Sequence, residues 1–264
     1  MATTEVDGLR IAYERSGDGR PIVFVHGYVG DGPTTWRPQL DALADEFAVV
    51  AWDAPGAGRS SDPQEPFGMA GYADCLAAFI ERLVLVRPTV VGLSFGGALA
   101  LALCHRHPDV AGSVVLASAY AGWRGSLPAE VADARLHQAM ALAECSPDEV
   151  VDALLPTMFA EGTPAASVEA FGEAMRTFHP SGFRSMALAA AEDLREALPS
   201  VDVPCLLLYG DHDVRAPLSV AEELHAAIAG STLVVLEGAG HVCNIEAPRA
   251  FNEAVRDFVR TGCA

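Results

Sequence analysis

Positive charge is scarce in this sequence. Only 17 side chains are lysine or arginine, against 35 that are aspartate or glutamate, so the formal net charge is −18 at pH 7. Such an excess of negative charge repels the phosphates of nucleic acids and the headgroups of anionic lipids. We therefore expect neither nucleic-acid binding nor attachment to a membrane surface.

Paired cysteines and clusters of metal ligands are also missing. The chain has no C-x-x-C pair and no His/Cys cluster at the spacing of zinc ligands. A metal site is therefore not expected, and the simplest interpretation is a set of buried free thiols in a reducing compartment. The six cysteines are Cys75, Cys104, Cys145, Cys205, Cys243 and Cys263.

Long apolar runs are absent too. No stretch approaches the ~20 uncharged residues of a membrane span. The first residues, MATTEVDGLRIAYER, lack the basic region and apolar core of a signal peptide. These absences favour a soluble, cytoplasmic protein, and no feature of the sequence indicates an oligomeric state.

What the sequence does contain is an alternation of short apolar runs with helical patterns. A hairpin is predicted around Asp7-Gly8. The apolar runs that follow stand at 21–25, 47–52, 89–91, 110–118, 205–209 and 232–236. Short β-branched runs separated by amphipathic segments predict an α/β fold, with a mostly parallel central sheet of about eight strands and helices on both faces.

The strand pattern stops between 119 and 199. This segment is helical, follows the sixth strand and holds four of the 6 methionines and four of the 11 phenylalanines. We expect residues 1–118 and 200–264 to form the core and residues 119–199 to form a helical cap. The methionines and phenylalanines either fill an ordinary helical core or line an apolar substrate pocket, and both interpretations stay open.

A serine stands at the junction between one strand and one helix. Gly92-Leu93-Ser94-Phe95-Gly96 is a G-x-S-x-G pattern directly after an apolar run and before a helical one. In this strand–turn–helix context the serine hydroxyl is presented as a nucleophile, and the glycines remove Cβ atoms that would collide on so sharp a turn. Ser94 is therefore the candidate nucleophile.

A serine hydroxyl needs a base to take its proton and a third group to orient that base. Asp213 and His241 each follow a predicted strand, and the carboxyl ends of parallel strands converge on one crevice. The chain order serine, aspartate, histidine matches one of three common triad orders. Asp211 stays open as the acid and His212 as the base.

The tetrahedral intermediate of acyl transfer needs donors for its oxyanion. We expect one from the N–H of Phe95, the residue after the nucleophile, and the other from the N–H of Tyr28, in the loop after the 21–25 strand. Gly27 allows close approach of that loop. His26 is expected to brace the loop rather than to move protons.

Five motifs spread over nearly the whole chain resemble those of the α/β-hydrolase fold family, in its lid-bearing serine esterase and lactonase branch. They are VHG at 25–27, WDAPGAGRS at 52–60, GLSFGG at 92–97, LLLYGDHDVRAP at 206–217 and GAGHVCNIEAP at 238–248. In this family the acid falls three residues after the strand-ending glycine, which implies Asp213. A serine at position 94 sets aside the family's dehalogenases and epoxide hydrolases, which use aspartate.

The resemblance, closest to 3-oxoadipate enol-lactonase-like enzymes, implies a serine hydrolase of small carboxylic esters or lactones that needs no cofactor. One alternative is a C–C bond hydrolase, whose carboxylate-bearing substrate would need an arginine such as Arg124, Arg184 or Arg195. The others are a cofactor-free haloperoxidase or perhydrolase and a hydrolase-like ligand sensor. The residues expected to line the substrate pocket are His26, Gly27, Trp123, Met158, Phe159, Phe178, Val214 and Val242.

Overall fold

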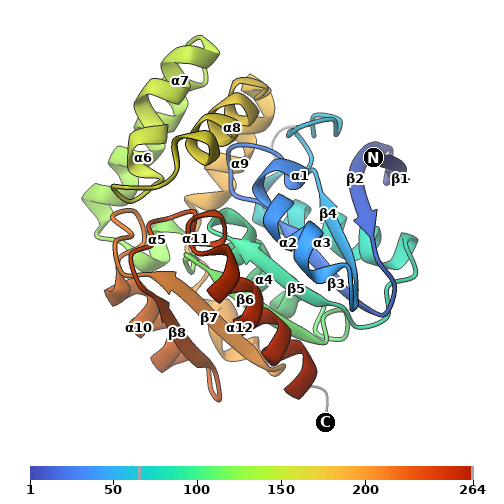
Figure 1. Cartoon of the computed structure of the whole chain (residues 1–264). Helices are drawn as coiled ribbons and strands as arrows, with labels where there is room; N and C mark the ends of the chain where they lie inside the picture. The colour runs from blue at the N-terminus through green and yellow to red at the C-terminus, as the bar shows by residue number, and fades with distance from the viewer. Residues whose placement is uncertain (65–66, 263–264) are drawn as a thin grey trace.

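The computed structural model describes residues 1–64 and 67–262, and its centre is a sheet of eight strands in the order β1-β2-β4-β3-β5-β6-β7-β8 (Figure 1). Strands β3 to β8 run parallel to one another, whereas β1 and β2 form an antiparallel hairpin at one edge, and β2 pairs antiparallel with β4. The strands are β1 (Ala2–Val6), β2 (Leu9–Ser16), β3 (Arg20–Val25), β4 (Phe47–Trp52), β5 (Thr89–Leu93), β6 (Ser113–Ala117), β7 (Cys205–Gly210) and β8 (Thr232–Leu236).

The apolar runs became strands because both faces of the sheet are covered. Every residue of β4, β5, β6 and β7 is buried, as expected of parallel strands with helices on either side. Strand β8 lies at the far edge and is only partly buried. The run expected at 110–118 forms a strand only over Ser113–Ala117, since the N–H of Val110 instead closes a turn onto the carbonyl of His107.

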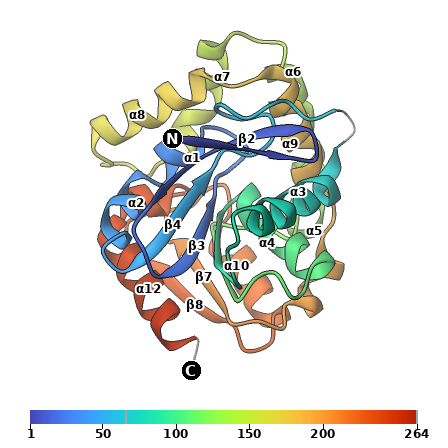
Figure 2. The same cartoon turned by 90° about the vertical axis from the view of Figure 1, so that its right-hand side faces the viewer.

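Two sets of helices cover the sheet. On one face α2 (Arg37–Leu43) packs against α12 (Pro248–Thr261), and on the other lie α3 (Gly68–Arg82), α4 (Phe95–Arg106) and α10 (Leu218–Ala227) (Figure 2). Helix α4 is buried from Phe95 to Cys104, which explains why its sequence is apolar all round. Helix α12 buries one stripe, Phe251, Val255 and Val259.

Helices alone fill the described chain between β6 and β7. Most of them lie over the end of the sheet, apart from the helices that flank the strands (Figure 1), whereas the last, Arg195–Ser200, contacts α4 beside the sheet. The elements are α5 (Trp123–Ser126), α6 (Ala129–Leu142), α7 (Pro147–Leu154), η1 (Leu155–Thr157), α8 (Ala165–Arg176), α9 (Pro180–Ala190) and η2 (Arg195–Ser200). We keep 119 and 199 as the proposed boundaries of this cap.

The cysteines within the described residues are free. Four of them, Cys75, Cys104, Cys205 and Cys243, are buried, whereas Cys145 is half-buried, and Cys263 lies outside the described residues. Burial raises the pKa of the Cys243 thiol to about 12, so it stays protonated at neutral pH. In the same part of the chain, no helix combines the length and the apolar character needed to cross a membrane.

Candidate active site

Ser94 sits on a strained turn between β5 and α4. Its backbone has φ 54° and ψ −110°, in the positive-φ region that side chains other than glycine rarely adopt. The turn is held by a hydrogen bond from the N–H of Ser94 to the carbonyl of Ala117, 2.8 Å away. A Cβ on Gly92 would lie 2.1 Å from the carbonyl oxygen of Gly96, so only glycine fits there. The strand, turn and helix together present one serine at the strand end.

His241 and Asp213 meet where β8 and β7 end. The Nδ1 atom of His241 lies 2.9 Å and 3.1 Å from the two carboxylate oxygens of Asp213. The side chain of Asp213 is fully buried and that of His241 is 4% exposed. Ser94 and His241 line the same cavity, so the structure brings the three candidate triad residues together.

The Asp213 carboxylate is held ionised by its surroundings. Burial by itself would raise its pKa, but the charge and hydrogen bond of His241 outweigh this, and the pKa falls below its ordinary value. The backbone N–H groups of Arg215 and Ala216 both donate to Oδ1 at 2.8 Å, and the Ser118 hydroxyl also lowers the pKa. An ionised carboxylate can only accept, so it fixes the proton of His241 on Nδ1 and leaves Nε2 free as a base.

The alternative acid and base lie elsewhere. Asp211 is exposed, and its carboxylate accepts the backbone N–H of Gly238 at 2.7 Å, closing the turn between the β7 and β8 loops. His212 is exposed as well. Neither residue lines the cavity of Ser94.

The loop after β3 faces the nucleophile through Gly27. The position that a Cβ of Gly27 would take lies 3.9 Å from the Cβ of Ser94. The buried N–H groups of Tyr28 and Phe95 donate no hydrogen bond to any residue that the structure describes. Buried backbone donors are nearly always paired, so two unpaired ones beside a serine are suited to an incoming oxygen atom.

His26 fixes the direction of one of these donors. The N–H of Ala54 donates to its Nε2 at 3.0 Å, so the ring proton is on Nδ1, which donates to the carbonyl of Gly27 at 2.6 Å. Because that carbonyl and the N–H of Tyr28 belong to one planar peptide, holding the first aims the second the opposite way. Burial lowers the pKa of His26, which keeps the ring neutral.

The cavity at Ser94 is small, with a volume of about 10 Å³. Three of the expected pocket residues line it, Gly27, Met158 and Val242, together with Tyr28, the expected oxyanion donor, whereas His26 does not. Its other lining residues, besides Ser94 and His241, are Val29, Leu93 and Phe171, which the sequence did not single out. Their side chains are apolar, like those of the many buried residues around them. No sequence signal therefore distinguishes them as cavity residues.

Four of the expected residues lie behind the lining or away from it. Trp123 packs edge-on against Tyr28 with ring centroids 5.5 Å apart, and Phe159 packs edge-on against Phe171 at the same separation. Phe178 contacts Phe183, which in turn stacks on Tyr28. These aromatic rings support the lining rather than form it. Val214 is 74% exposed, because its side chain points out of the β7 loop.

The cap arginines singled out from the sequence lie at the surface. Arg124 pairs with Asp133, Arg184 with Glu144, and Arg195 with Asp193. The arginines near the site are two others. Arg215 donates to the hydroxyls of Thr157 and Tyr28, at 2.9 Å and 3.1 Å. Arg135 donates to the Tyr120 hydroxyl and to the carbonyl of Arg215.

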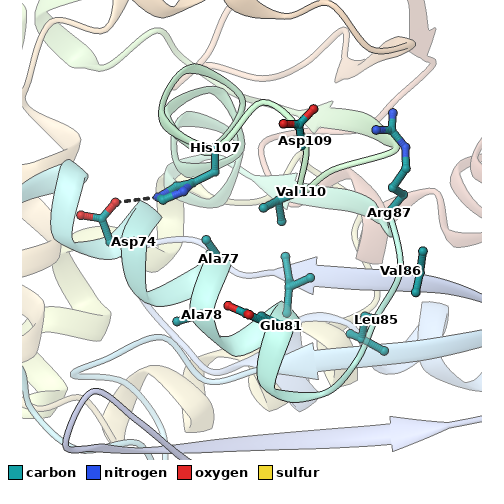
Figure 3. A pocket seen from close by; sticks show the side chains of 11 residues that line it. Asp74, Ala77, Ala78, Glu81, Leu85, Val86, Arg87, His107, Asp109 and Val110 are labelled. Carbon is teal, nitrogen blue, oxygen red and sulfur yellow. Dashed lines mark hydrogen bonds and ion pairs between the residues drawn. The ribbon is translucent and has the colours of Figure 1, made fainter.

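A larger cavity of about 450 Å³ lies at the opposite end of β5 (Figure 3). Asp74 on α3 points toward His107 at the end of α4, and the two side chains are 2.7 Å apart. Arg87, which stands just before β5, marks its far side. Ser94 follows the other end of β5, so this larger cavity is separate from the candidate triad. No group of three or more potential metal ligands occurs among residues 1–64 and 67–262.

Residues 22–254 match the alpha/beta hydrolase family. The chain belongs to this family. That membership confirms the α/β-hydrolase fold predicted from the sequence and the resemblance drawn from the five motifs.

Several named proteins resemble this chain over most of its length. 3-Oxoadipate enol-lactonase 2 of Acinetobacter baylyi is 29% identical, over 91% of this chain and 89% of that enzyme. A pimeloyl-(acyl-carrier protein) methyl ester esterase of Neisseria meningitidis is 30% identical, over 92% of this chain and 94% of its own length. The structure of a thermophilic esterase from Thermogutta terrifontis superposes with a TM-score of 0.89 and 28% identity, covering 99% of this chain and 97% of that one.

Proposed function

We propose that the chain is a serine hydrolase that cleaves small carboxylic esters or lactones through an acyl-enzyme on Ser94. The observation that carries the proposal is the shared cavity of Ser94 and His241, with the imidazole held by the buried carboxylate of Asp213. A serine on a strained strand–helix turn, a histidine and an orienting carboxylate make up the machinery of nucleophilic acyl transfer.

Each group then has one role in the reaction. The Oγ of Ser94 attacks the substrate carbonyl while Nε2 of His241 takes its proton, and the N–H groups of Tyr28 and Phe95 donate to the oxyanion. Collapse of the intermediate expels the alcohol, which receives that proton from His241, and leaves an ester on Ser94. Water, deprotonated by His241, then releases the acid and restores the serine. Asp213 keeps the imidazole in the required tautomer and stabilises the imidazolium.

The substrate class is supported by the lining and by the relatives. Apart from His241, no ionisable side chain except the Tyr28 phenol lines the cavity, so the bond cleaved is expected to sit in an uncharged group. An ester or a lactone fits that environment. The names of the two related enzymes, a lactonase and a methyl ester esterase, point to the same pair of substrates.

Hydrolysis of p-nitrophenyl acetate by the wild type and by Ser94→Ala tests the proposal. Removing the nucleophile should lower kcat by about 10³-fold or more, with the thermal unfolding temperature little changed. Ser219→Ala removes an exposed hydroxyl on α10 and should leave kcat unchanged. Activity that survives Ser94→Ala would refute the assignment of the nucleophile. A wild type without turnover on any ester would favour the ligand-sensor alternative.

A further inference from the structure

The cavity at Ser94 is too small for any ester. Its volume of about 10 Å³ is close to the space that one water molecule occupies. Sites that bind small organic ligands usually measure about 300–1,000 Å³. A substrate must therefore displace one of the side chains that close the cavity.

Polar contacts tie the cap to the core beside the cavity. The carbonyl of Met158 accepts the backbone N–H groups of both His241 and Val242, at 3.0 Å and 3.1 Å. The Glu246 carboxylate accepts the N–H of Ala160 at 2.6 Å from the cap and the N–H of Gly240 at 2.9 Å from the histidine loop. Displacing these groups would disturb the loop that carries His241.

Arg215, whose Nε atom is buried, also ties the cap to the core, through the hydroxyls of Thr157 and Tyr28. Opening the cavity there would break hydrogen bonds of a buried charge, which costs more than moving an apolar ring. A substrate is therefore not expected to enter where polar contacts tie the cap to the core.

Phe171 also lines the cavity, and no polar contact of its side chain ties the cap to the core. This α8 side chain is 2% exposed and packs edge-on against Phe159. It is the one residue that lines both the Ser94 cavity and an outer groove of about 250 Å³ between α8 and the core. The other residues of that groove are Thr34, Arg37, Pro38, Ala166, Ser167, Ala170 and Ile245.

The groove offers no free charge. Arg37, its only ionisable residue, donates two hydrogen bonds to the carboxylate of Glu14, at 2.8 Å and 2.9 Å, and a longer one to Asp41. The rest of its surface comes mainly from alanine, proline, isoleucine and phenylalanine side chains. The groove therefore suits an uncharged apolar chain, and its volume suits one arm of a ligand rather than a whole ligand.

We propose that Phe171 is a gate between the two spaces, and that the outer groove binds an uncharged apolar arm of the substrate while the ester group reaches Ser94. The assignment rests on the proposed hydrolase function. Rotation of the Phe171 side chain joins the groove to the cavity without breaking a polar contact of the cap. Phe171 then selects substrates by the length of one arm.

The test fills the groove without touching the cavity. Ala170→Trp places a large ring in the groove from an exposed position of α8. Ala165→Trp makes the same change at an exposed alanine of α8 that is not among the lining residues, and it is the matched control. Each protein is assayed with p-nitrophenyl acetate against p-nitrophenyl octanoate, and with ethyl acetate against octyl acetate, so that the long chain stands on either side of the ester.

Ala170→Trp should lower kcat/KM at least tenfold for the long substrate of one series and change it less than twofold for the short one. The series that responds tells whether the groove holds the acyl or the alcohol arm. Ala165→Trp should leave all four values within twofold. The assignment of the groove as a binding site would be overturned if Ala170→Trp left the long-to-short ratio of kcat/KM unchanged in both series. It would also be overturned if Ala165→Trp changed that ratio equally.

Phe171→Ala tests the gate itself. Joining the two spaces should raise the long-to-short ratio at least fivefold in the series that responds to Ala170→Trp. An unchanged ratio in a folded Phe171→Ala protein would overturn the proposal that Phe171 is a gate. If this variant unfolds, the Ala170→Trp result still tests whether the groove binds the substrate arm. Hydrolysis of the acetate, and its loss in Ser94→Ala, reports the proposed function separately from these ratios. A wild type that cleaves neither acetate nor octanoate would overturn both.

Discussion

The loops at the strand ends and the cap that covers them are held in different ways. Backbone geometry holds the loops: the N–H of Ser94 bonds to Ala117, and backbone N–H groups of the β7 loop grip the carboxylate of Asp213. The cap is tied to the core by the backbone carbonyl of Met158 and also by side chains that reach across, among them Glu246 and Arg215. Backbone contacts persist through most substitutions, whereas side-chain contacts change with a single one.

The strand-end loops and the cap therefore have different roles in the proposed site. The groups proposed to carry out the reaction stand on the sheet, where packing fixes them to within the small tolerance that catalysis needs. The residues that decide how much room a substrate has, such as Phe171 and Met158, come from the cap. A family built in this way can change its substrates by altering the cap and keep its reaction unchanged.

The largest effect should follow a change in the strand-end loops. Asp213→Asn replaces the acceptor of His241 Nδ1 with a group that also donates, which favours the wrong imidazole tautomer. We expect kcat on p-nitrophenyl acetate to fall by about 10³- to 10⁴-fold. Asp211→Asn, two residues away, alters only an exposed turn and should cost less than about tenfold. Equal losses in the two variants, or a larger loss for Asp211→Asn, would reassign the acid.

The same division explains what the sequence could predict. The strands can be predicted because each is a short apolar run in the sequence. Ser94, Asp213 and His241 follow strand ends at fixed offsets, so the local sequence is enough to find them. The helices of the cap were predicted as a segment without their arrangement. Which cap side chain faces Ser94 depends on how α8 packs against the core. The sequence of α8 alone does not determine that packing.

Two sets of residues show the limit of the sequence. Phe159 and Phe178 have the same character as Phe171, but only Phe171 reaches the cavity, while the other two support rings behind the lining. Arg124, Arg184 and Arg195 were proposed for a carboxylate because they lie in or near the cap, yet they form surface ion pairs. Burial of an arginine beside Tyr28 depends on contacts from distant segments, which spacing along the chain does not reveal.

A smaller effect should follow a change in the contacts between the two regions. Glu246→Gln keeps the size of the side chain but turns one of its two acceptors into a donor, facing either Ala160 or Gly240 N–H. An unsatisfied, partly buried donor costs about 1–3 kcal/mol. We expect the free energy of unfolding, measured in urea, to fall by that amount and kcat to fall by severalfold, because the Gly240–His241 loop loosens.

Glu253→Gln is the matched control for that change. Glu253 is exposed on α12, and the same substitution there should leave both stability and kcat unchanged. If Glu246→Gln behaves like its control, the carboxylate does not tie the cap to the histidine loop, and the side-chain contacts between the two regions would be reduced to those of Arg215.

The smallest effect should come from the surface of the cap. Arg124→Ala removes an ion pair with Asp133 at 3.1 Å, in which both side chains are about half exposed. Water screens such pairs, and they contribute about 0–1 kcal/mol. We expect a change in unfolding free energy of less than about 0.5 kcal/mol, and a change in kcat/KM of less than twofold for neutral esters and for esters that carry a carboxylate. A KM that rises only for the carboxylate-bearing esters would place Arg124 in substrate binding, and would favour the C–C bond hydrolase alternative, whose substrate carries a carboxylate.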